Sequence, residues 1–332
     1  MGAAEDFEVL CVGETMVMVT PEVAVPLRTA GACVLRAGGA ESNVAIFLSA
    51  LGHRVAWASR LGNEPLGELV LDAVGGTGVD TSKVEIADGE QTGVYFKDPG
   101  RDGTRVYYYR STSAASRMAP GFLNRSQAQG VRAVHVSGIT AALSRSCAAL
   151  LDDIVIRRVL GDAVVSFDVN YRAALWSAEQ AAPVLLRLAQ AADVVFVGLD
   201  EAAELWGTSR AEEVRPILPT PSWVIVKDAS REAYEFASPA VTRVPALRVE
   251  VVEPVGAGDA FAAGWLSGWL RGLPGRGRLR LGHLMAAVAL SSTSDHGAVP
   301  GPEDLQVTLQ LDDHEWDGCR PVTTDNQEPD QA

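Results

Sequence analysis

The run 254–259, Pro-Val-Gly-Ala-Gly-Asp, places two glycines and an acidic residue directly before an apolar segment, 260–270. The glycines permit a tight turn and leave backbone N–H groups uncovered. Because the apolar segment has the composition of a helix, we expect the turn at a helix N-terminus, where unpaired N–H groups and the helix dipole attract an anion. The carboxylate of Asp259 in the same turn can accept a proton. An anion hole formed by Gly256, Ala257 and Gly258 beside a base is what phosphoryl transfer to an alcohol requires.

This turn differs from two well-known phosphate-binding loops. No Gly-Lys-Ser/Thr follows it, as a P-loop would require, and its third glycine is misplaced for the dinucleotide fingerprint. For the string taken alone, an ordinary helix start is the alternative, with glycine for the turn and aspartate for the dipole.

A second glycine pair, Gly38-Gly39, precedes another helix-like segment, 40–51. Bare backbone at this point would let a polyol approach closely, and Asn43, one helical turn later, could hydrogen-bond a sugar hydroxyl. We therefore treat Gly38, Gly39 and Asn43 as candidate substrate-binding residues. A simple turn followed by a polar helix residue is the alternative.

Short apolar runs separated by helix-like stretches predict the fold. They occupy 7–13, 55–59, 133–137, 164–168, 194–197 and 223–226. This alternation predicts an α/β fold with a doubly wound, mainly parallel sheet. Active sites of such sheets lie at the carboxyl ends of the strands. The polar or glycine residues that follow these runs are therefore candidates: Ser137, Asp168, Asn170, Arg172, Gly198, Glu201 and Lys227.

Two regions, about 14–36 and 90–110, do not fit the alternation and are rich in short strand-like runs. The runs 92–97 and 104–109 flank a Pro-Gly-containing turn and predict a hairpin. We expect a small separate β-sheet that serves as a lid over the strand ends, with an ordinary edge hairpin as the alternative. Tyr95 and Tyr108 are candidates to close over a sugar, and packing between sheets is their alternative role.

Arg110 and Arg172 bear on the substrate class. A guanidinium binds a carboxylate through two hydrogen bonds, and a neutral ketose offers no such partner. These arginines in an acidic chain favour a sugar acid over ribose or fructose, although Arg172 could serve the phosphates of a nucleotide instead. An ordinary ion pair with Asp or Glu is the alternative for either residue.

Composition limits the possible partners and the compartment. The chain has 332 residues, of which 47% are hydrophobic, and a net charge of −14. An acidic surface argues against nucleic acid and anionic membranes as partners. The 4 cysteines show neither CxxC spacing nor metal-ligand spacing, so we expect free thiols and a cytoplasmic location. One domain is expected over 1–311, followed by an acidic, loosely ordered tail over 312–332.

Both glycine motifs in this order resemble those of the ribokinase-like (PfkB) carbohydrate kinases, over about residues 7–305. Within that superfamily the chain looks most like 2-keto-3-deoxygluconate kinases. The supporting strings are Gly13-Glu14-Thr15-Met16, Tyr107-Tyr108-Tyr109-Arg110, Ser113-Ala114-Ala115-Ser116, Ser137-Gly138-Ile139-Thr140 and Asp168-Val169-Asn170-Tyr171-Arg172.

The resemblance implies a role for each matched position. Asp259 would be the general base on the sugar hydroxyl, and the N–H groups of residues 256–258 would form the anion hole. Positions that contact the sugar acid match Gly39, Tyr95, Tyr108, Arg110, Arg172 and Asp295. Positions that line the ATP site match Asn170, Gly198, Lys227 and His283. Mg²⁺ would arrive with ATP, with Glu201 ordering its water indirectly.

One loop departs from the family. Members often carry two glycines after the position of Lys227, next to the nucleotide, whereas this chain has Asp-Ala-Ser-Arg-Glu-Ala over 228–233. Side chains now stand where bare backbone would approach ATP, and Glu232 adds a negative charge, so nucleotide affinity is expected to be weak.

The sequence thus predicts an ATP-dependent kinase that phosphorylates the terminal hydroxyl of 2-keto-3-deoxygluconate. Two alternatives stay open: a kinase of the same fold for a neutral sugar or nucleoside such as fructose, ribose or adenosine, and a non-catalytic sensor of sugar acids or nucleotides. Exposed lid strands also predict a homodimer through these strands.

Overall fold

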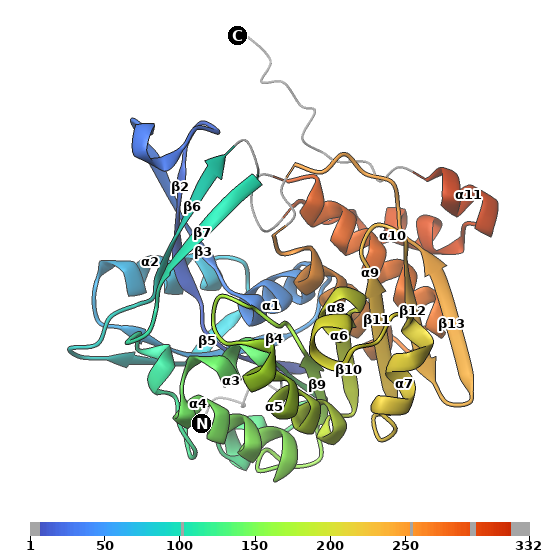
Figure 1. The fold of residues 1–332 in the computed structure, drawn as a ribbon, viewed down its shortest axis with the longest axis horizontal. Helices are drawn as coiled ribbons and strands as arrows, with labels where there is room; N and C mark the ends of the chain where they lie inside the picture. Colours follow the sequence, from blue (N-terminus) through green and yellow to red (C-terminus); the bar gives the residue numbers. More distant parts are fainter. Residues whose placement is uncertain (1–6, 101–102, 253–254, 293–296, 320–332) are drawn as a thin grey trace.

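The computed structural model describes residues 7–100, 103–252, 255–292 and 297–319. Its main sheet has nine strands in the order β13-β12-β11-β10-β9-β8-β1-β4-β5 (Figure 1). The strands are β1 (Val9–Val12), β4 (Val55–Gly62), β5 (Asp80–Ala87), β8 (Ala133–Ser137), β9 (Val164–Asp168), β10 (Val194–Gly198), β11 (Trp223–Asp228), β12 (Glu232–Ala237) and β13 (Ala240–Pro245). All neighbouring strands pair in parallel except β11–β12 and β12–β13, which pair antiparallel.

Helices cover both faces of this sheet, as continuous apolar strands require. They are α1 (Ala40–Ala50), α2 (Pro65–Gly75), α3 (Gly138–Leu143), α4 (Arg145–Leu151), α5 (Ala178–Ala191), α6 (Leu199–Trp206), α7 (Val214–Ile217), α8 (Ala257–Leu270), α9 (Gly275–Leu290), α10 (Pro302–Gln310) and α11 (Asp313–Gly318). Alternate strand residues enter two separate cores: Val9 and Cys11 pack with α1, α8 and α9, whereas Leu10 and Val12 pack with α4 and α5. The doubly wound prediction is confirmed.

A second, small sheet has the order β3-β2-β6-β7 and stands apart from the main sheet (Figure 1). Its strands are β2 (Met16–Pro21), β3 (Cys33–Gly38), β6 (Val94–Gly100) and β7 (Gly103–Tyr109). The β6–β7 pair is the predicted hairpin. Both predicted regions therefore form one separate sheet, which we call the small sheet.

Two expectations needed correction. No strand was predicted at β5, β12 or β13, because polar residues interrupt the apolar character of these runs. The start of the acidic tail is also ordered: Asp313–Gly318 forms α11, with Trp316 buried at 1% exposure beneath the Arg280 guanidinium, 4.6 Å from its ring centroid. Apolar burial of one tryptophan and a cation–π contact outweigh the polar composition of this segment.

Candidate functional site

Asp259 lies in the first turn of α8 and is held by two asparagines from other elements. Asn43 Nδ2 on α1 donates to Asp259 Oδ2 at 2.9 Å, and Asn170 Nδ2 donates to Asp259 Oδ1 at 3.4 Å. Asn170 follows β9 with a φ of 39°, a left-handed conformation that asparagine tolerates better than most residues. The carboxylate is therefore fixed in orientation by two segments that are distant in sequence.

The backbone before Asp259 has the geometry that the two glycines predicted. Gly256 caps α8 with a φ of 85°, a value that a side chain would strain. The first helical bond of α8 runs from the Ala260 N–H to the Gly256 carbonyl at 2.9 Å. The preceding N–H groups, including those of Ala257 and Gly258, have no partner within the helix and are free to bind an anion.

The surroundings of Asp259 raise its pKa to about 7. Burial of the carboxylate is the main cause, and the charge of Asp168 adds to it. The hydrogen bond from Asn43 and the positive charges of Arg172 and Lys227 act in the opposite direction. A carboxylate with a pKa near neutral pH can exchange a proton with a hydroxyl during catalysis.

Asp168 and Lys227 form a buried ion pair at the carboxyl ends of β9 and β11. Lys227 Nζ lies 3.0 Å from Asp168 Oδ2, and their side chains are 19% and 3% exposed. Burial opposes the charge on Lys227, but the carboxylates of Asp168, Glu201 and Asp259 outweigh it and raise the lysine pKa. This pair brings a permanent cation to the site, and a Cβ added to Gly258 would lie 3.4 Å from Lys227 Nζ.

Glu201 lies beside this pair and accepts hydrogen bonds from backbone N–H groups after β9 and at the end of β10. Its Oε1 accepts the N–H of Tyr171 and its Oε2 accepts the N–H of Gly198, each at 2.7 Å. Burial raises the pKa of Glu201, and the charge of Asp168 adds to the effect. The clear structural role of Glu201 is therefore to hold the turn that carries Asn170, and indirect metal binding stays a prediction.

The carboxylates of this site do not form a cage for a resident metal. Within the described ranges, no group of three or more His, Cys, Asp or Glu side chains is placed to hold an ion. Asp168 is committed to Lys227, and Glu201 to backbone N–H groups. These donors fit Mg²⁺ that arrives bound to phosphates better than Mg²⁺ held by protein alone.

Arg172 and His283 have different surroundings. Arg172 is 47% exposed, donates to its neighbouring Tyr171 carbonyl at 3.0 Å, and lies near enough to Asp259 to lower its pKa. His283 on α9 is buried, with Nε2 3.1 Å from the Val244 carbonyl and its ring 5.1 Å from that of Phe261. Burial lowers the pKa of His283 to about 4, so its ring is neutral. Contact of either residue with ATP or substrate stays a prediction.

The small sheet gathers the predicted aromatic residues. Tyr95 and Tyr108 pair across β6 and β7 with ring centroids 5.8 Å apart, and the guanidinium of Arg110 lies 5.6 Å from the Tyr108 ring. Arg110 also forms an ion pair with Glu14, whose side chain is fully buried. Ser113 donates a second hydrogen bond to the same carboxylate. The alternative considered for Arg110, an ion pair with an acidic residue, is thus present in the structure.

Gly39 has a different reason to be glycine than the one expected. A Cβ at this position would lie 2.4 Å from the Glu14 carbonyl oxygen and 2.8 Å from the Thr15 Cα. Close packing against protein backbone therefore requires glycine here, and contact of Gly39 with a sugar stays a prediction. Gly38 ends β3 opposite Met16, so both glycines join the small sheet to α1.

Asp295 lies outside the described residues. Two acidic residues that matter here were missing from the predicted site: Glu14, which pairs with Arg110, and Glu41. Glu41 is fully buried on α1 and accepts hydrogen bonds from Ser137 Oγ at 2.7 Å and Thr140 Oγ1 at 3.0 Å. Glu14 stands in the string 13–16, and Glu41 lies two residues after Gly39, but only the fold reveals their partners.

The unusual loop 228–233 is a tight connection between β11 and β12. Arg231 Nε and Nη2 donate to the two oxygens of Asp228 at 2.8 and 2.6 Å. Glu232 lies 3.1 Å from Arg243 Nε and accepts from the Tyr234 hydroxyl. The negative charge of Glu232, which we expected to weaken nucleotide binding, therefore has a cationic partner.

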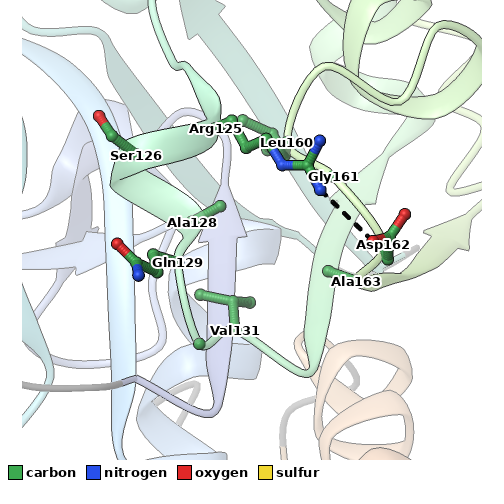
Figure 2. Close-up of a pocket in the computed structure, with 10 residues that line it drawn as sticks. Arg125, Ser126, Ala128, Gln129, Val131, Leu160, Gly161, Asp162 and Ala163 are labelled. Atoms are coloured by element: carbon green, nitrogen blue, oxygen red, sulfur yellow. Dashed lines mark hydrogen bonds and ion pairs between the residues drawn. The ribbon is translucent and has the colours of Figure 1, made fainter.

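A surface hollow elsewhere in the molecule is not part of this site. It has a volume of about 710 Å³ and is lined by residues 125, 126, 128–131 and 160–163, in the segments that precede β8 and β9 (Figure 2). Those loops lie at the amino ends of the strands, whereas Asp168 and Ser137 lie at the carboxyl ends. None of the residues around Asp259 lines this hollow.

The family is decided by comparison with known sequences. The pattern of the pfkB family carbohydrate kinases matches residues 6–300. The chain belongs to this family. It is therefore an ATP-dependent sugar kinase, and the predicted ribokinase-like fold and carbohydrate kinase activity are confirmed. Among the helices of the described ranges, none has the length and apolar character needed to cross a bilayer.

Similar PfkB kinases include two proteins named 2-dehydro-3-deoxygluconokinase. The one from Bacillus subtilis is 34% identical over 80% of this chain and 84% of its own length. The one from Thermoproteus tenax is 31% identical over 91% of this chain and 94% of its own length. Among solved structures, a PfkB protein from Polaromonas is 32% identical, with a TM-score of 0.82 over 90% of this chain and 99% of its own.

Proposed function

We propose that this PfkB kinase phosphorylates the terminal hydroxyl of 2-keto-3-deoxygluconate, with Asp259 as general base. The observation that carries the chemistry is the carboxylate of Asp259, held by Asn43 and Asn170 beside the unpaired N–H groups at the start of α8. The relatives named 2-dehydro-3-deoxygluconokinase support the substrate.

In the proposed reaction, Asp259 accepts the proton of the sugar hydroxyl as its oxygen forms a bond to the γ-phosphorus of ATP. The bond from that phosphorus to the bridging oxygen breaks, and ADP leaves. The N–H groups of residues 256–258 and the Lys227 ammonium stabilise the negative charge on the transferred group. Mg²⁺ bound to the phosphates would neutralise part of the same charge.

A neutral sugar is the second candidate, and one contact favours it. Because Arg110 is already paired with Glu14, it offers less positive charge to a carboxylate than an unpaired arginine would. A relative from maize named fructokinase-1 is 31% identical over 78% of this chain and 81% of its own length.

ADP release with MgATP tests the proposal, using 2-keto-3-deoxygluconate, gluconate, fructose, ribose and adenosine as acceptors. We expect turnover concentrated on the keto-deoxy acid. Turnover mainly on fructose, ribose or adenosine would overturn the substrate assignment. Folded protein that binds an acceptor but releases no ADP with any of them would favour the sensor.

We also propose that two copies pair through the small sheet. Its edge strands are β3 and β7, and Leu35, Tyr107 and Tyr109 on them are 47%, 45% and 68% exposed. Apolar and aromatic side chains on open edges favour pairing with another chain. Light scattering after size-exclusion chromatography should give twice the mass of one chain, and the Tyr109→Glu variant should give a lower mass.

A cytoplasmic location is proposed from the free thiols of the cysteines, of which Cys11 and Cys147 are buried.

A further inference from the structure

Four side chains form one row across the small sheet. Met18 of β2 is opposite Arg36 of β3 and also opposite Tyr95 of β6, and Tyr95 is opposite Tyr108 of β7. Residues that are directly opposite in neighbouring strands leave a sheet on the same face. Arg36 therefore shares a face with both tyrosines that were predicted to contact the substrate.

The other face of the small sheet is covered by α2. Val17, Ala37 and Val94 leave that face and pack in the core that includes Leu66 and Leu69 of α2. The row that contains Arg36 points away from α2. In the view of Figure 1, the small sheet stands between α2 on one side and α1 and α8 on the other. The Arg36 face is thus the face of the small sheet that α2 does not cover.

The cations on this face differ in their partners. Arg110 is 8% exposed and paired with Glu14, and Lys97 is 3% exposed. Arg36 is half-buried, and no hydrogen bond or ion pair joins it to any residue in the described ranges. A half-buried guanidinium has lost part of its hydration without gaining a counter-charge. In a chain with a net charge of −14, an unpaired cation on the same face as two tyrosines is suited to an anionic ligand.

A short segment of chain joins Arg36 to the helix that contacts Asp259. Arg36 lies three residues before Gly39, which caps α1, and Asn43 of that helix contacts Asp259. A six-carbon acid carries its carboxylate and its terminal hydroxyl at opposite ends. A site that phosphorylates this hydroxyl at Asp259 therefore needs a cation about one sugar length away.

We propose that Arg36 binds the substrate carboxylate and strengthens the preference for acids. This inference rests on the proposed function. A guanidinium can donate two parallel hydrogen bonds to a carboxylate, and a neutral sugar offers no equivalent acceptor pair.

The test compares Arg36→Ala with Arg105→Ala in steady-state kinetics of the full chain. Arg105 is exposed on the same sheet, and its register opposite Asp98 places its side chain on the other face. Each variant removes one positive charge, but only Arg36→Ala removes it from the face that carries the two tyrosines. For 2-keto-3-deoxygluconate we expect Arg36→Ala to raise KM by about 10- to 100-fold, as the loss of a charged hydrogen-bonded contact predicts. The KM of Arg36→Ala for ATP should stay unchanged. For the keto-deoxy acid, the KM of Arg36→Lys should lie between those of the wild type and Arg36→Ala, and the KM of Arg105→Ala should match that of the wild type.

Equal KM values for Arg36→Ala and Arg105→Ala would overturn the inference while leaving the proposed function intact. So would an equal rise in KM for the acid and for fructose, because it would indicate a general loss of geometry. Failure of the wild type to phosphorylate any sugar acid would overturn both the proposed function and this inference. Thermal unfolding of each variant without ligand shows whether a kinetic change reflects a folding defect.

Discussion

Asn43 and Asp259, 216 residues apart in the chain, are joined by a hydrogen bond of 2.9 Å between Asn43 Nδ2 and Asp259 Oδ2. Asn43 lies on the helix that follows strand β3 of the small sheet, and Asp259 lies in the first turn of α8, whose N-terminus we propose as the anion hole. The contact therefore couples the placement of the small sheet to the orientation of the carboxylate that we propose as the base. It also lowers the pKa of Asp259 against the larger effect of burial.

Asp259→Asn should abolish nearly all turnover, by a factor of about 10²–10⁴ or more, because asparagine cannot accept the hydroxyl proton. ADP release measures this loss, and circular dichroism should show an unchanged fold. Near-normal turnover in the variant would exclude Asp259 as the base.

The same substitution should change the pH dependence of stability. The folded-state pKa of Asp259 is about 7, above its ordinary value of 3.8, so folding favours the protonated form. The stabilisation from this proton is complete below pH 3.8 and is lost as the pH rises to about 7. Asparagine carries no such dependence. The difference in unfolding midpoint temperature, Asp259→Asn minus wild type, should therefore increase from pH 4 to about pH 7 and stay constant at higher pH. A constant difference would contradict the raised pKa.

Asn43→Ala should move the acid limb of kcat/KM to higher pH. The wild-type limb should fall below about pH 7, because only the ionised Asp259 accepts a proton. Loss of the Asn43 hydrogen bond removes a contribution that lowers this pKa, so a higher pH is needed to ionise the base. A profile of kcat/KM from pH 5 to 9 measures the shift, with Asn63→Ala, at an exposed residue directly after β4, as the control. A limb that does not move would exclude Asn43 as a partner of the base in solution.

Lys227→Met should destabilise the fold by about 3–5 kcal/mol, because it leaves the buried carboxylate of Asp168 without its cation. Urea unfolding measures the change. The double variant Asp168→Asn/Lys227→Met removes both charges and should recover much of the lost stability. If the double variant were as unstable as Lys227→Met, the loss would come from packing of the lysine stem and not from the unpaired charge.

Trp316→Ala should lower the free energy of unfolding by about 3–5 kcal/mol, as for other fully buried aromatic side chains. Trp316 is 1% exposed, and its Nε1 donates to the Pro245 carbonyl at 2.9 Å. Denaturant unfolding tests this value, with exposed Val307→Ala on α10 as the control. A change below about 1 kcal/mol would mean that α11 is not docked in solution.

The sequence by itself determined the features that depend on local chemistry. Gly256 and Gly258 with Asp259 predict a turn, an anion hole and a base because backbone freedom and proton affinity belong to the residues themselves. The apolar runs predict parallel strands, and the carboxyl ends of parallel strands meet at one edge. Asn170, Lys227 and Glu201 could therefore be expected near Asp259 before any fold was known.

Only the tertiary structure decided which charges have partners. Arg110 and Arg172 look equivalent in the sequence, yet Arg110 is paired with the buried Glu14. Arg172 is half exposed, and its Nη1 lies 3.9 Å from Glu201 Oε1. The role of Arg36 likewise depends on its register opposite Met18. Ion pairs and cross-strand rows join residues that are distant in the chain. Their strength depends on burial and distance, which no local pattern encodes, and so the fold had to supply them.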